Sequence, residues 1–451
     1  MKDRSVTYQK IFFSLFWFYA TVSFIIGDIF VFLEPLRTYL MFAADCVLAL
    51  LGICCLRHKI DYIIVGVFTI LALVVSLVLN KLSIAFTVNG FRDFFGILFC
   101  YPICRYFWDA RERHDRFIAQ LDKELFRFLV LQSFCIVYQF FAYGTGDLVG
   151  GSLGAWRSGE ISLLIYLISF YLLSKRIDRH NIIDSVYHNW IYLVLLFPTF
   201  LNETKISFVM LALYFILLMP IDRKMFVRLL AATPIFAFLA VIGFMTYRMT
   251  ADKVNQGKNI FSREYLVEYM IMDIDEAEGD AKWNMENNSD VDIPRITKFL
   301  LLQQIDSREP GHILTGFGVG HFKGGTNFAV SEFYNEFDWY LLGTIPYLIH
   351  IYLQLGIAGV VWLLCFLPLV FIRKPKLYRV RDLNLQLYII ITIFMVFFYI
   401  DVLRQPMFCM IVFALALACW REGSDEEAGE ETADVDADEP ATPELETTPT
   451  T

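Results

Sequence analysis

Long hydrophobic runs separated by short charged segments repeat along almost the whole chain. A helix needs roughly 20 apolar residues to cross a hydrocarbon core of about 30 Å, and twelve such runs can be marked. They cover residues 11–33, 38–56, 62–79, 94–108, 126–143, 161–173, 186–201, 206–219, 225–245, 345–372, 383–399 and 403–420. The pattern predicts an all-α polytopic membrane protein of about 12 transmembrane helices, with helices 1–9 in residues 1–246 and helices 10–12 in residues 340–421.

Lysine and arginine gather in every second connection between the predicted helices, at residues 2–10, 57–59, 105–127, 175–179, 223–228 and 373–381. Because short basic loops stay cytoplasmic, both termini are predicted to be cytoplasmic. The long polar segment 247–339, between helices 9 and 10, then falls on the other side of the membrane. It is predicted to be a large external subdomain, periplasmic or extracellular.

Composition supports the membrane class, since 57% of the residues are hydrophobic and 44 of them are Phe. Residues 422–451 hold twelve acidic residues and no basic one, which predicts a disordered, acidic cytoplasmic tail. Without the tail the chain is only slightly basic, so nucleic acid is not an expected partner. The nine cysteines lie in or beside apolar segments, which predicts neither a disulfide framework nor a metal site.

Three predicted spans, 94–108, 161–173 and 206–219, are too short to cross by their apolar residues alone. Each runs from outside to inside and is preceded by polar sequence with a cation, namely Arg92, Arg157 or Lys205. Arg404 stands similarly at the start of the last span. A helix N-terminus favours an anion, and charges at membrane depth usually line a substrate path. We therefore expect an outward-facing pocket for an anion; the alternative is cations that snorkel to lipid phosphates.

A glycine-rich turn, GFGVGHFKGG, stands at residues 316–325 of the external segment. Gly316, Gly318 and Gly320 permit tight backbone and close approach of a ligand. The flanking pattern does not fit a dinucleotide site. His321 within the turn is a candidate base or ligand, and its alternative role is structural.

The layout and several short motifs together resemble the bacterial O-antigen polymerase and O-antigen ligase superfamily. The motifs are GSLGAWRSGE at 151–160, ETKIS at 203–207, the arginines Arg248 and Arg263 after the ninth span, the 316–322 turn, and LGIAG at 355–359. What the resemblance implies is metal-independent glycosyl transfer without a cofactor, from an undecaprenyl-pyrophosphate carrier to an acceptor hydroxyl at the outer leaflet of the bacterial plasma (inner) membrane.

Under this resemblance the donor and the acceptor are lipid-linked oligosaccharides of an O-antigen, capsule or exopolysaccharide. Other implied partners are membrane lipids, a chain-length regulator and a flippase. Preplaced cations stabilise the charge that develops on a pyrophosphate leaving group. The candidates for that role are Arg157, Lys205 and Arg248, followed by Arg92, Arg263 and Arg404.

The transfer also needs a general base near the acceptor hydroxyl, for which Glu160, Glu203 and His321 are the candidates. Ligases of the superfamily have a His at the mouth of the helix after the large loop, where this chain has Gly343-Thr344-Ile345-Pro346. This difference favours a polymerase of repeat units over a ligase. A membrane transporter is the alternative from another class, because charged helix mouths also mark transport paths.

Overall fold

The computed structural model describes residues 2–144, 148–155, 157–177, 182–202, 205–219, 293–321, 337–341, 344–372 and 380–421. Within these ranges the protein is helical, apart from irregular connections and a two-residue antiparallel ladder between β1 (Val380–Arg381) and β2 (Trp420–Arg421). The predicted all-α class is confirmed for this part of the chain.

Five helical stretches in the described ranges are long and apolar enough to cross a membrane, as expected of an integral membrane protein. They are α1 (Lys2–Phe24) with the π-helical turn η1 (Ile25–Ile29), α2 (Glu34–Cys55), α3 (Lys59–Leu73) with the π-helical turn η3 (Val74–Leu79), α6 (Arg111–Tyr143) and α17 (Tyr347–Ile372). The total of twelve spans and their orientation remain predictions.

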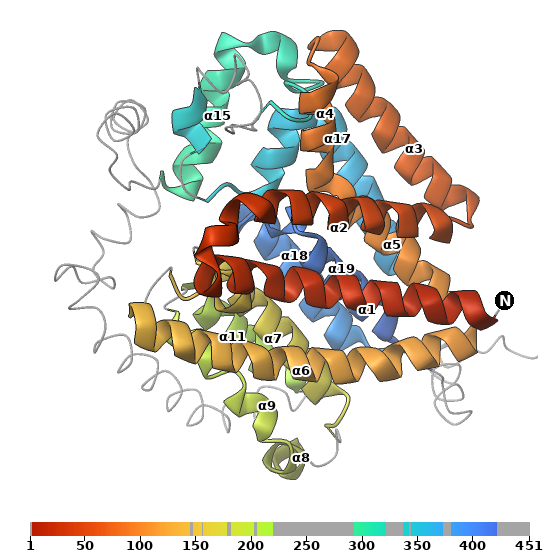
Figure 1. Ribbon diagram of the computed structural model, residues 1–451, viewed down its shortest axis with the longest axis vertical. Coiled ribbons are helices and arrows are strands. Elements are labelled where there is room, and N and C mark those ends of the chain that lie inside the picture. The colour runs from red at the N-terminus through yellow and green to blue at the C-terminus, as the bar shows by residue number, and fades with distance from the viewer. Residues whose placement is uncertain are drawn as a thin grey trace, which may run out of the picture.

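Shorter helices fill the space between the long ones (Figure 1). They include α4 (Ile84–Phe91), α5 (Phe95–Trp108), α7 (Ser158–Ser174), α11 (Lys205–Leu218), α18 (Leu383–Tyr399) and α19 (Pro406–Ala418). Helix α5 packs against both α2 and α19, and α7 packs against α11, α18 and α6.

Helices α5, α7 and α19 are buried along nearly their whole length. A helix that is apolar all round is typical of such a fully buried position. Two of the three spans that the hydrophobic pattern marks as short correspond to α5 and α7. Their ends are covered by protein rather than lipid, so polar residues there can line a cavity between helices.

The predicted span 186–201 differs from the structure, which divides this stretch into α8 (Ile182–His188), α9 (Ile191–Val194) and α10 (Pro198–Leu201). Asn189 ends α8 by donating from its side-chain amide to the Ser185 carbonyl at 2.8 Å. Pro198, which lacks an N–H, occupies the first position of α10. Both residues favour helix ends over a continuous helix.

The described part of the 247–339 segment packs on the first half of α17. Helix α15 (Arg295–Arg308) contributes Leu301 and Ile305 to a small hydrophobic core that also contains Trp339 and Leu353. The predicted span at 225–245, the segment 247–292 and the tail 422–451 lie outside the described residues.

Helix α17 is broken at Gly356, whose φ is 61°. The break leaves the carbonyl groups of Leu353 and Gln354 without helical partners, and they accept from the N–H groups of Phe317 (2.8 Å) and Gly318 (2.9 Å). In a membrane, backbone groups freed by a helix break have to find such partners within the protein. The glycine-rich turn therefore completes the hydrogen bonding of α17.

Candidate functional site

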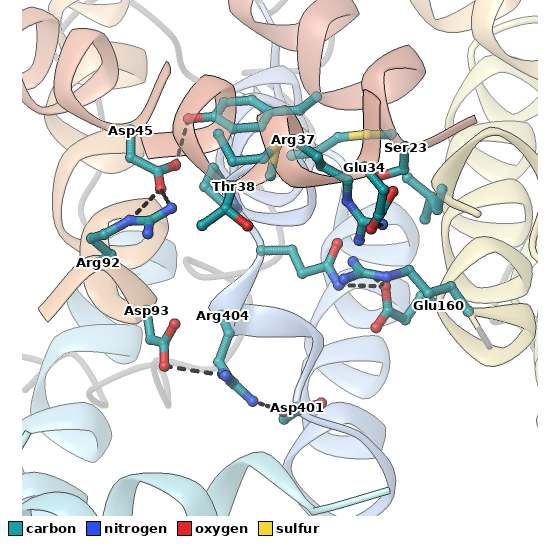
Figure 2. A pocket seen from close by; sticks show the side chains of 17 residues that line it. Ser23, Glu34, Arg37, Thr38, Asp45, Arg92, Asp93, Glu160, Asp401 and Arg404 are labelled. Atoms are coloured by element: carbon teal, nitrogen blue, oxygen red, sulfur yellow. Dashed lines mark hydrogen bonds and ion pairs between the residues drawn. The ribbon is translucent and has the colours of Figure 1, made fainter. Parts of the chain in front are cut away.

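A cavity of about 400 Å³ lies where α1, the start of α2, and the starts of α5, α7 and α19 meet. The lining includes Arg92 in η4 (Arg92–Phe94), Arg157 just before α7, and Arg404 in η8 (Val402–Arg404). Glu160, in the first turn of α7, lines it as well. The structure thus brings together three of the predicted cations and one predicted base, from segments far apart in the chain (Figure 2).

Arg92 is held by a carboxylate of α2. Its Nε and Nη2 atoms donate to Oδ2 of Asp45 at 2.9 Å and 2.7 Å, and its guanidinium lies 5.0 Å from the ring centroid of Phe42. The other oxygen of Asp45 accepts from the Tyr19 hydroxyl at 2.8 Å. Asp45 is 7% exposed as a side chain, so the pair is largely removed from solvent, and Arg92 is fixed in direction.

Arg404 lies between two carboxylates. Nη1 donates to Oδ2 of Asp401 at 2.5 Å, and Nη2 donates to Oδ2 of Asp93 at 3.2 Å. The Nε atom of Arg404 is buried and has no hydrogen-bond partner among the described residues. A buried donor without a partner costs about 1–3 kcal/mol.

Glu160 joins α7 to the start of α19. Its Oε2 accepts from Nε2 of Gln405 at 2.6 Å and from Nη1 of Arg157 at 3.4 Å. The acidic group stands in the first turn of α7, where the helix dipole favours negative charge. Arg157 contacts this carboxylate weakly and is 33% exposed, so most of its five N–H donors remain available to a ligand.

The cavity contains charges of both signs. Four arginines line it, together with five carboxylates. Arg37 pairs with Glu34 at 2.8 Å, so each of the four arginines has a carboxylate within ion-pair distance. An anion that binds here would have to share the arginines with these carboxylates or displace the carboxylates from them.

Apart from Glu160, the carboxylates of the cavity are functional candidates that the sequence prediction missed, together with Arg37 and Gln405. Asp45 lies inside the predicted span 38–56. An ionisable residue within an apolar run is itself a sign of a functional site, so this signal was present in the sequence. Asp93, Asp401 and Gln405 border predicted helix starts and carry no comparable signal.

Four predicted site residues cannot be placed in the cavity. Glu203, Arg248 and Arg263 lie outside the described residues, as does the side chain of Lys205, whose backbone begins α11. Asn202 donates to Oγ of Ser162 at 2.8 Å, which ties the chain just before α11 to the first half of α7. The expected roles of these residues stay predictions.

The three glycines of the turn contact backbone and lie outside the cavity lining. Gly316, Gly318 and Gly320 have φ values of 70°, 93° and 106°, which glycine alone adopts readily. A Cβ on Gly320 would lie 2.2 Å from the Phe86 carbonyl oxygen of α4, and a Cβ on Gly90 would lie 2.2 Å from the Gly320 nitrogen. Gly320 and Gly90 therefore permit the close approach of the turn and α4, whereas Gly316 lies against the backbone of α17 and Gly318 against Ser76 of η3.

His321 ends the described part of the turn and does not line the cavity. Burial lowers its pKa to about 4, and the neighbouring His312 contributes in the same direction. The imidazole is therefore neutral at physiological pH. Its backbone N–H donates to the Gly318 carbonyl at 3.5 Å. This hydrogen bond lies within the turn, as the structural role of His321 requires.

Comparison with known proteins gives no protein-family model that matches the chain and no curated protein that matches its sequence.

Proposed function

We propose that this protein is a membrane glycosyltransferase that polymerises undecaprenyl-pyrophosphate-linked oligosaccharide repeat units into a bacterial surface polysaccharide. The proposal combines the superfamily resemblance of the sequence with the geometry of the cavity. The observation that carries it is that Arg92, Arg157 and Arg404, from three separate helix starts, line one cavity together with the buried carboxylate of Glu160.

In the proposed reaction the acceptor hydroxyl oxygen attacks the anomeric carbon of the donor sugar. A carbon–oxygen bond forms, and the bond from that carbon to the phosphate oxygen breaks with its electron pair moving to the pyrophosphate. The hydroxyl proton passes to the carboxylate of Glu160. The polyprenyl pyrophosphate leaves with increased negative charge, which arginine guanidinium groups stabilise through paired N–H donors.

The charge pairs of the cavity fit this role as a preorganised set. Fixed donors stabilise a transition state best when they need not reorganise during the reaction. Arg92 and Arg404 are each held by a carboxylate at 3 Å or less, whereas the nearest carboxylate oxygen to Arg157 is at 3.4 Å. We propose that Arg157 contacts the leaving group directly.

Deleting the gene and examining the surface polysaccharide on a gel tests the proposal. A single repeat unit in place of a ladder supports a polymerase. Chains that accumulate on the lipid carrier and never reach their final acceptor indicate a ligase, and a normal ladder contradicts both. Complementation with Arg157→Ala should fail to restore the ladder while the protein remains in the membrane.

Arg127→Ala is the matched control for that variant. Arg127 lies on α6 and pairs with Glu124 at 3.1 Å with the same three-residue spacing as Arg157 and Glu160. It is 66% exposed and does not line the cavity. This variant should restore the wild-type ladder. A wild-type ladder from both variants contradicts the pyrophosphate role of Arg157.

A transporter is the second candidate, favoured by the near balance of four arginines and five carboxylates in the lining. Paired charges of this kind line water-filled substrate paths. The discriminating measurement is substrate uptake by proteoliposomes that contain the purified protein. Uptake of the lipid-free repeat unit without formation of longer glycans supports the transporter and contradicts the polymerase.

We propose the finer topology with the function: twelve spans, both termini cytoplasmic, and the 247–339 segment external in the bacterial plasma membrane. A phosphatase that is active only outside the cytoplasm, fused after Asp280 or after Lys376, tests this orientation. Activity from the first fusion alone supports it. Activity from the second fusion would contradict it.

A further inference from the structure

A second chamber of about 560 Å³ adjoins the cavity on the side of η1. The two share part of their lining, so they form neighbouring compartments of one groove. The shared residues are Ser23, Glu34, Arg37, Leu153, Arg157 and Glu160.

The residues that line only the second chamber differ in chemistry from those that line only the first. They are Gly27, Asp28, Val31, Gly154 and Ala155, which include one carboxylate, no cation and three residues with no more than a methyl side chain. The first chamber has two arginines of its own, Arg92 and Arg404, together with Asp45, Asp93 and Asp401. A pyrophosphate is favoured in the first chamber because guanidinium N–H groups are added only there, whereas the second chamber adds Asp28 and no cation.

Small residues make room in the second chamber. A Cβ placed on Gly27 would meet no atom within 4 Å, so the backbone of η1 borders open space there. Gly154, with a φ of 91°, forms the opposite lining together with Ala155. A flat ring can approach backbone closely at such positions.

Asp28 is oriented by its neighbours. Nε2 of Gln139 donates to Oδ2 of Asp28 at 3.2 Å. The same amide is fixed by Gly151, whose carbonyl accepts from Nε2 at 3.0 Å and whose N–H donates to Oε1 at 2.7 Å. A carboxylate offers about four acceptor positions on its two oxygens. Asp28 therefore keeps capacity to accept hydrogen bonds from ligand hydroxyl groups.

Glu160 lies on the boundary and lines both chambers. A base at this boundary can reach a hydroxyl held in one chamber while the bond to the leaving group breaks in the other. Glu160 thus stands between a compartment with two arginines of its own, Arg92 and Arg404, and one whose own residues include no cation.

We propose that the second chamber binds an uncharged, hydroxyl-rich sugar of the acceptor glycan, with Asp28 accepting hydrogen bonds from its hydroxyls. This assignment rests on the proposed glycosyltransferase function. It separates the two substrates by chemistry, with the pyrophosphate of the donor in the first chamber and the acceptor sugar in the second.

Thermal unfolding of the full-length protein in nanodiscs tests the assignment with two probes. One is inorganic pyrophosphate, and the other is one repeat unit of the host polysaccharide freed of its lipid carrier. A ligand at free concentration c that binds the folded state stabilises it by RT ln(1 + c/Kd), so the melting temperature rises with the concentration and the affinity of the ligand. Both probes should stabilise the wild-type protein.

The substitution Gly27→Leu fills the second chamber and should abolish the shift caused by the oligosaccharide while keeping the shift caused by pyrophosphate. Asp28→Asn should raise the Kd for the oligosaccharide about tenfold or more, as expected for loss of a hydrogen bond to a charged group. Arg404→Gln should show the opposite pattern, with a weakened pyrophosphate shift and an unchanged oligosaccharide shift.

Gly66→Leu is the matched control for bulk, since a Cβ on Gly66 also meets no atom within 4 Å and the residue lies on α3 away from both chambers. An oligosaccharide shift that survives both Gly27→Leu and Asp28→Asn overturns the assignment, as does its equal loss in Gly66→Leu or its absence from the wild type. If pyrophosphate does not stabilise the wild type, the proposed function itself fails.

Discussion

Oδ2 of Asp93 lies 3.2 Å from Nη2 of Arg404, although 311 positions separate the two residues in the chain. The contact joins the segment before α5 to the segment before α19. The same oxygen lies 3.8 Å from Nε2 of His350, a residue of α17 that is 3% exposed. Asp93 therefore connects the cavity to the buried part of the first half of α17.

Asp93→Asn should lower chain extension at least tenfold while the protein still reaches the membrane. The amide keeps the shape of the side chain but removes the charge that holds Arg404, so the guanidinium is free to turn toward Asp401. Loss of a hydrogen bond between charged groups costs about 1.5–3 kcal/mol. Ladder length in complemented cells and the melting temperature in detergent measure the two effects.

Asp115→Asn serves as the control for this prediction. Asp115 is 60% exposed, on α6, and does not line the cavity. Wild-type ladders from Asp93→Asn, at equal protein level, would show that the orientation of Arg404 does not matter for extension.

Glu160→Gln should slow transfer by about 10²–10⁴, the contribution of a positioned acid–base group. The amide can still interact with Gln405 and Arg157, but it cannot take up the hydroxyl proton. Single-turnover extension of a purified lipid-linked substrate measures the rate. Binding of pyrophosphate should be retained, since it does not require a base.

Glu124→Gln on α6 is the comparison for that substitution. Glu124 is 10% exposed as a side chain and pairs with an arginine three residues away, so its burial resembles that of Glu160. Equal rates for Glu160→Gln and the wild type would assign the proton to another group.

Gly320→Ala should reduce the amount of folded protein in the membrane. The added Cβ would lie 2.2 Å from the Phe86 carbonyl oxygen, and the φ of 106° is strained for any other residue. Backbone strain of this kind costs about 1–3 kcal/mol before the clash is counted. Gly311→Ala, where a Cβ meets nothing within 4 Å, should leave the melting temperature unchanged. Normal melting of Gly320→Ala would contradict the packing of the turn against α4.

His321 should make the folded state less stable in acid. Its pKa is lowered from 6.5 to about 4, first by burial and then by His312. Between these values the unfolded chain binds a proton that the folded chain does not, so this contribution is complete above pH 6.5 and is lost as the pH falls toward 4. The melting temperature in detergent from pH 7 to pH 4 measures it.

His321→Gln should flatten that acid dependence. His188→Gln is the control, because the His188 side chain is 68% exposed and its removal should leave the curve unchanged. An identical acid dependence in the wild type and His321→Gln would contradict a neutral, buried imidazole.

Much of the architecture follows from local sequence. The apolar runs predict the membrane class, and the long helices α1, α2, α3, α6 and α17 each overlap a predicted span. The unusually short spans also direct attention to Arg92 and Arg157. The long apolar helices can be predicted because the transfer of a helix into lipid depends on the side chains of a single window of residues.

Other features depend on contacts between distant segments. The break in α17 at Gly356 is completed by the turn at residues 316–318, and the stretch at 186–201 contains helix ends that its hydrophobicity conceals. A hydrophobic run reports the preference for lipid or protein over water. It does not show where a helix breaks and its backbone groups form hydrogen bonds with another segment instead.

The sequence by itself determined that the chain is helical and apolar enough for a membrane, and that cations stand at several helix starts. Only the tertiary structure decided that Arg92, Arg157 and Arg404 border one cavity, and that each is paired with a carboxylate. Asp45, Asp93 and Glu160 receive their contacts from residues up to 311 positions away. Hydrophobic partition is a local property of the chain, whereas the pairing of charges depends on how the helices pack.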